Sequence, residues 1–101
     1  MSPGLAIYAP GTVIHASFPF GRHYAVVGED AGEFLEVHPV TSREWPEEIY
    51  PSLRVDPSKY VPFSKPSFIQ VISVRISKDI IDNDFGTLPE ESWRKLQEVR
   101  E

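Results

Sequence analysis

Two hydroxyl side chains stand where a predicted strand ends. Thr41 and Ser42 directly follow Pro39-Val40, at the end of an apolar segment. This position suits a core poorly and suits contact with a ligand well, because the hydroxyls could bond a phosphate. The alternative is a Ser/Thr turn, in which the same hydroxyls bond the local backbone. The pair is the first place to look for a binding site.

Three other residues could supply acid–base chemistry or positive charge. His23 follows a predicted turn, and histidine is the side chain that exchanges a proton near neutral pH; alternatively, it only faces solvent at the start of a strand. Arg22 could contact a phosphate or be an ordinary exposed residue of the turn. Arg75 interrupts an apolar strand, so it must pair with a carboxylate or reach solvent, with phosphate binding as a further role.

No metal site is expected from the histidines or the carboxylates. If Phe18 stands opposite His23 in a hairpin, His15 stands opposite Val26, and the two histidines lie on opposite faces of the sheet. The acidic residues of segment 79–84 lack the spacing of a calcium loop. We expect them to form a solvated acidic turn.

Length and composition limit the classes of protein that fit. The chain has 101 residues, no cysteine and a net charge of -5. One domain is expected, and dimerisation would add apolar burial to such a small core. The acidic balance argues against nonspecific coating of DNA. With neither a signal peptide nor a membrane-length apolar run, we expect a soluble, cytoplasmic protein without membrane contact.

The hydrophobic pattern predicts a mainly β fold. We expect strands at 12–18, 23–28 and 34–40, a largely irregular connection over 43–66 with a short strand near 53–55, and a strong strand over 67–77 that breaks near Val71-Ile72. The turns before residues 23 and 34 contain glycine, which favours hairpins. We therefore expect short antiparallel strands that form a small, strongly bent sheet or barrel, with a C-terminal helix packed on it.

A helix is predicted at the C-terminal end. Asn83–Gly86 indicates a turn, and Thr87 with Glu90 has the spacing of a capping box. The apolar residues that follow share one arc of a helix and are Leu88, Trp93, Leu96 and Val99. We expect this arc to lie on the sheet.

The order of these motifs resembles the PemK/MazF family of bacterial toxin endoribonucleases. The matching segments are Gly11-Thr12-Val13, Ser17-Phe18-Pro19-Phe20, Tyr24-Ala25-Val26-Val27, Val37-His38-Pro39-Val40-Thr41-Ser42, Lys65-Pro66-Ser67-Phe68-Ile69, Val74-Arg75 and Gly86-Thr87-Leu88. They span residues 11–100, within a single domain over 1–101. The resemblance implies an SH3-like small β-barrel with a C-terminal helix, as in PemK, MazF and CcdB-like proteins.

The resemblance also implies an activity. Members of the family cleave single-stranded RNA at specific sequences without metal or other cofactors, form homodimers and bind an antitoxin protein. A base helps the ribose 2′-hydroxyl attack the adjacent phosphate, and a cation stabilises the developing charge. By this resemblance the catalytic candidates are His23, Arg22 and Thr41, and the candidate substrate contacts are Ser42, Arg75 and Phe20.

Two other hypotheses stay open. His23 stands where the family has arginine, the turn before it is short, and the chain is acidic. These features favour a catalytically inactive barrel that binds protein or nucleic acid. A toxin that inhibits a protein target such as gyrase, as CcdB proteins do, would need an exposed tryptophan near the C-terminus, whereas Trp93 is expected to pack in the core.

Overall fold

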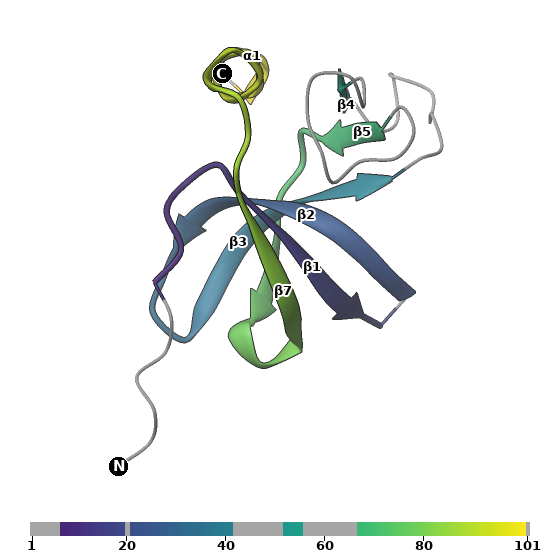
Figure 1. Ribbon diagram of the computed structural model, residues 1–101, viewed down its shortest axis with the longest axis vertical. Coiled ribbons are helices and arrows are strands. Elements are labelled where there is room, and N and C mark those ends of the chain that lie inside the picture. The colour runs from purple at the N-terminus through teal and green to yellow at the C-terminus, as the bar shows by residue number, and fades with distance from the viewer. Residues whose placement is uncertain (1–6, 20, 42–51, 56–66, 101) are drawn as a thin grey trace.

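The fold is mainly β with one C-terminal helix, as expected (Figure 1). In the computed structural model the described residues are 7–19, 21–41, 52–55 and 67–100. The elements in chain order are β1 (Thr12–Phe18), β2 (Gly21–Asp30), β3 (Phe34–Thr41), β4 (Ser52–Val55), β5 (Ser67–Gln70), β6 (Val74–Ser77), the 3-10 helix η1 (Lys78–Ile80), β7 (Ile81–Thr87) and α1 (Glu90–Arg100). Apart from β4, the connection predicted over 43–66 lies outside the described residues.

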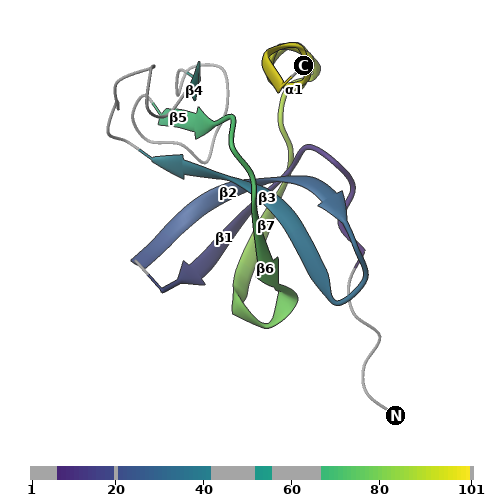
Figure 2. The same ribbon diagram turned by 180° about the vertical axis from the view of Figure 1, so that it is seen from behind.

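All strand pairs are antiparallel, and the sheet has the order β4-β5-β3-β2-β1-β7. Strand β3 changes partner along its length: Phe34–Val37 pairs with β6, and Val40 and Thr41 pair with β5. The predicted break at Val71-Ile72 is confirmed, since it separates β5 from β6. The sheet bends round (Figures 1 and 2), but no ladder of the described residues joins β6 to β7, so it is not closed into a barrel.

The predicted hairpin of β1 and β2 is confirmed, but its predicted register is wrong by two residues. Phe18 stands opposite Gly21, and His15 stands opposite Tyr24. The expected four-residue turn had included Gly21, which instead begins β2 as a paired strand residue. A shift of two residues keeps every side chain on its predicted face. His15 and His23 therefore still lie on opposite faces of the sheet.

Two clusters of apolar side chains bury β1, β2 and β3 on both faces. The inner cluster consists of Ile14, Ala16, Phe18, Ala25, Val27, Leu35, Val37 and Ile76. The helix-side cluster consists of Val13, Val26, Val40, Val55, Ile69, Leu88 and Leu96, with Trp93 packed against it. Because alternate residues of a strand face opposite sides, the runs of valine, isoleucine and alanine in β1 and β2 serve both clusters.

The segment before the helix differs from its predicted turn. Residues 81–87 form β7, which pairs with β1, and Thr87 stands opposite Thr12. The helix begins at Glu90, where the Pro89 carbonyl accepts a hydrogen bond from the Trp93 N–H at 3.0 Å. The predicted cap at Thr87 was therefore wrong: its backbone belongs to the sheet, because pairing with β1 extends the strand through residues of low strand propensity.

Gly11 lets the start of β1 approach the helix. Its φ is +89°, and an added Cβ would lie 3.3 Å from the Trp93 ring. Its carbonyl accepts a hydrogen bond from the Leu88 N–H at 2.9 Å. The prediction that Leu88, Trp93 and Leu96 face the sheet is confirmed, since all three belong to or contact the helix-side cluster; the side chain of Val99 lies outside the described part.

Candidate functional site

The predicted site residues fall on three strands. Arg22 and His23 lie near the start of β2, Thr41 is the last residue of β3, and Arg75 lies in β6. Ser42 and Phe20 lie outside the described residues.

His23 and Thr41 lie at the same end of β2 and β3. The ladder between these strands ends at the pair Ala25–Pro39. His23 lies two residues beyond this pair on β2, and Thr41 lies two residues beyond it on β3. From there β3 turns towards β5 while β2 continues beside β1 (Figure 1). By alternation His23 faces the inner cluster, and its ring centroid is 6.3 Å from that of Phe18. The two residues thus flank the point where the strands separate.

Arg22 and Arg75 do not join them. Arg22 is exposed and stands opposite Ser17, so its side chain leaves β2 on the face opposite to that of His23. Arg75 Nη2 lies 3.4 Å from Glu36 Oε1, which confirms the expected pairing with a carboxylate. Glu36 in turn stands opposite Glu29, about 20 Å along β2 from His23 at the usual rise per strand residue.

A polar group that sequence reasoning missed joins β1 to β7. The Ser17 hydroxyl donates a hydrogen bond to Asp82 Oδ2 at 3.1 Å. His15 Nδ1 lies 3.4 Å from the same oxygen. The Ser17 hydroxyl therefore bonds the carboxylate and not the imidazole, so the group lacks the serine–base contact that activates a nucleophile. Asp82 faces Nδ1 of His15, so Nε2 is the ring nitrogen farther from the carboxylate.

Aromatic rings continue the same face towards the helix. Tyr24 stands opposite His15, and their ring centroids are 5.1 Å apart in an edge-on arrangement. The centroid of the Phe85 ring lies 5.6 Å from that of Tyr24, and Phe85 is 37% exposed. Because Ser17 pairs with Arg22, this face carries a guanidinium, an imidazole and an exposed aromatic ring in succession. Aspartate and asparagine are depleted in strands, which is why Asn83–Gly86 had indicated a turn and β7 had given no local signal.

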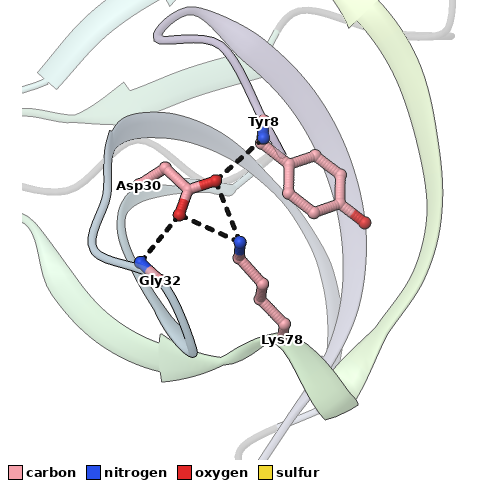
Figure 3. A network of polar contacts seen from close by, with 4 residues as sticks. All are labelled: Tyr8, Asp30, Gly32 and Lys78. Carbon is pink, nitrogen blue, oxygen red and sulfur yellow. Dashed lines mark hydrogen bonds and ion pairs between the residues drawn. The ribbon is translucent and has the colours of Figure 1, made fainter. Parts of the chain in front are cut away.

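A second polar network lies at the end of β2 that is farther from His23 (Figure 3). The Asp30 carboxylate accepts hydrogen bonds from the Tyr8 N–H, the Gly32 N–H and Lys78 Nζ, each at 2.9 Å. The bond from Tyr8, with those from Lys78 and Gly32, lowers the pKa of Asp30 against the opposing effect of burial. The ammonium also lies 5.7 Å from the centroid of the Tyr8 ring. Because the carboxylate is fully engaged with donors, this network is a structural tie between the N-terminal segment, β2 and η1.

His38 also has a structural role, because its side chain is part of the packing between strands. Its ring is fully buried, and Nδ1 lies 3.0 Å from the Gln70 carbonyl oxygen. An added Cβ at Gly28 would lie 3.0 Å from His38 Nε2. The absent side chain of Gly28 therefore leaves the space that the imidazole fills between β2 and β5.

The remaining observations concern the chain as a whole. In the described ranges no three His, Asp or Glu side chains gather to hold a metal ion. Within the same ranges, no helix has both the length and the apolar character needed to cross a membrane. In comparisons with known proteins, no protein-family model matches the sequence, and no curated protein is significantly similar to it.

Proposed function

We propose that the protein is a PemK/MazF-like endoribonuclease that cleaves single-stranded RNA without a metal ion. The observation that carries the proposal is the position of His23 and Thr41. These residues come from two separate motifs, yet they lie at the same end of β2 and β3, where the two strands separate. A base and a hydroxyl at one sheet end are the groups that such a cleavage reaction needs.

The arrangement of strands supports the same proposal. Strands β7, β1, β2, β3 and β6 pair in succession and bend around the inner cluster, and α1 lies outside them (Figure 2). We take this as an open form of the SH3-like barrel that the resemblance implies. The homodimer and the antitoxin partner that it also implies belong to this proposal.

The proposed chemistry needs no nucleophile from the protein. His23 accepts the proton of a ribose 2′-hydroxyl as that oxygen bonds to the adjacent phosphorus. The bond from phosphorus to the 5′-oxygen breaks, and the leaving oxygen takes a proton from solvent. The products are a 2′,3′-cyclic phosphate and a 5′-hydroxyl. Thr41 donates a hydrogen bond to the phosphate and holds it in place for the attack.

The test is cleavage of a mixed-sequence single-stranded RNA in EDTA, with analysis of the product ends. We expect discrete fragments that carry cyclic or 3′-phosphate ends. His23→Ala should lower the rate by about 10²- to 10⁴-fold, the usual contribution of a general base, and Thr41→Ala should also lower it greatly. Arg75→Gln serves as a control, because Arg75 is paired with Glu36 at the far end of the sheet. Equal cleavage by the wild type and both site variants would contradict the assignment of these residues.

A second candidate function is a non-catalytic binding module on the same fold. It is favoured by the opposite directions of Arg22 and His23 and by the pairing of Arg75 with Glu36, because neither arginine then lies beside His23. A folded protein that binds single-stranded RNA in a fluorescence anisotropy titration but leaves it intact would support this candidate.

A further inference from the structure

We propose that one face of the β1–β2 hairpin binds one nucleotide unit of a single-stranded RNA. This outer face carries His15 and Arg22 and lies opposite the face of His23. Arg22 would contact the phosphate, His15 Nε2 would accept a hydrogen bond from the ribose hydroxyl, and the base would stack on Phe85. The class of ligand rests on the proposed function. The face itself is separate from His23 and Thr41, because His15 and Arg22 lie on the opposite side of the sheet.

The order of the groups along this face matches the order of parts in a nucleotide. Arg22 lies at the hairpin end, two residue pairs along the ladder from His15, and diagonal neighbours of this kind are about 7–8 Å apart. The centroid of the Tyr24 ring lies 5.1 Å from that of His15 and 5.6 Å from that of Phe85. An exposed aromatic ring is a stacking platform for any unpaired base, and arginine is the preferred partner of phosphate.

The Asp82 carboxylate lies beside the imidazole of His15. Asp82 Oδ2 faces His15 Nδ1 at 3.4 Å and accepts a hydrogen bond from Ser17 at 3.1 Å. A carboxylate at Nδ1 favours the proton on that nitrogen, which leaves the lone pair on Nε2. The His15 side chain is 27% exposed, so a ligand on this face can reach it. Asp82 and Ser17 are therefore positioning residues that act through His15.

The distribution of charge decides where the phosphate binds. Asp82 and Asp84 bring negative charge to β7, at the edge of the sheet. Arg22 lies on β2, with β1 between it and β7. The backbones of β2 and β7 are two strand spacings apart, or about 10 Å, but the Asp82 side chain reaches across to Ser17, the residue opposite Arg22. Arg22 supplies the positive charge of this face, so the phosphate binds at the hairpin end, and the uncharged base lies over the side nearer β7.

The first test uses adenosine 5′-monophosphate, which has no internucleotide bond to cleave. Labelled protein is titrated with it and followed by NMR. We expect saturable shifts at Arg22, His15 and Phe85. The 2′-deoxy form should bind about 2- to 10-fold more weakly, as expected for one lost neutral hydrogen bond. Shifts at His23 and Thr41 instead, or no shifts on the outer face at millimolar nucleotide, would overturn the inference.

Two arginine variants separate a specific contact from general attraction. Arg22→Gln and Arg94→Gln remove the same charge, but Arg94 lies on α1 and pairs with Glu90. Arg22→Gln should weaken nucleotide binding by about tenfold or more, the usual effect of losing a charged hydrogen bond, whereas Arg94→Gln should leave it unchanged. Equal affinities in the two variants would count against the proposed phosphate contact.

The role of Asp82 has its own readout. The ring ¹⁵N shifts of His15 report which nitrogen carries the proton. We expect the Nδ1–H form to dominate in the wild type, and Asp82→Ala to raise the share of the Nε2–H form while weakening nucleotide binding. The Asp82 side chain is 41% exposed, so the variant should fold. Tautomer populations that do not change in the variant would refute the positioning role.

Failure of this inference can be told from failure of the proposed function. If the nucleotide shifts the outer face while RNA stays intact, the binding face stands and the endoribonuclease proposal fails. If RNA is cleaved in a His23-dependent manner and the nucleotide leaves this face unchanged, the endoribonuclease proposal stands and the binding face does not exist.

Discussion

Replacement of Asp30 by asparagine should destabilise the protein by about 3 kcal/mol, because breaking a fully buried ion pair costs about 3–5 kcal/mol and this pair is partly buried. The Lys78 side chain is 6% exposed and that of Asp30 is 16% exposed, so Asp30→Asn leaves a buried ammonium without its anion. The amide also offers one acceptor oxygen fewer to the N–H groups of Tyr8 and Gly32. We place the effect at the low end of the range because Asp30 retains some contact with water.

The assay is urea and thermal unfolding followed by far-ultraviolet circular dichroism. A loss of about 3 kcal/mol corresponds to a fall in Tm of roughly 12–24 °C in a domain of this size. Glu90→Gln is the matched control, because it removes one acidic partner of an exposed pair on α1 and should have little effect. The double variant Asp30→Leu/Lys78→Met should recover much of the stability, since no buried charge remains. An Asp30→Asn protein as stable as the Glu90→Gln control would refute the reasoning.

The same carboxylate makes a pH-dependent contribution. Its pKa is lowered in the folded protein, so the unfolded chain binds the proton more tightly. The stabilisation from Asp30 is therefore present above the unfolded pKa of about 4 and is lost as the pH falls through the folded value. The unfolding free energies of the wild type and Asp30→Asn should approach each other on acidification.

Two further substitutions test the core. Gly28→Ala should destabilise the protein by about 1–3 kcal/mol, as overpacking does, because the new methyl would lie 3.0 Å from buried His38 Nε2 and 3.4 Å from the Glu36 carbonyl oxygen; an unchanged urea midpoint would contradict this. Leu96→Ala removes a fully buried side chain of the helix-side cluster and should cost about 2–5 kcal/mol. Lys95→Ala, the exposed neighbour in α1, should change stability by no more than about 0.5 kcal/mol.

The parts of the fold that depend on local pattern could be predicted from sequence. Three strands of the meander and the break at Val71-Ile72 follow from β-branched runs and glycine turns. Strand β7 could not be predicted, because its residues have low strand propensity and are held by pairing with β1, a contact with a segment distant in sequence. The same tertiary pairing displaced the predicted helix cap at Thr87.

In the candidate site as well, features that follow from local sequence could be predicted, whereas features that depend on tertiary contacts could not. The placement of His23 and Thr41 at one end of the meander follows from two local motifs and from strand order. The approach of Asp82 to His15 depends on β7 and so could not be foreseen. The tie between Asp30 and Lys78 likewise brings together segments that no sequence spacing relates.

The late position of β7 in the chain has a consequence for how the protein folds. The pairs β1–β2 and β2–β3 join neighbours in sequence, whereas the ladder between β1 and β7 joins residue 14 to residue 84. Contacts between distant residues form slowly, because a long loop must close before they stabilise the chain. During synthesis, therefore, the meander emerges first with the outer edge of β1 unpaired. That edge stays open to association with other chains until β7 has left the ribosome and paired with it.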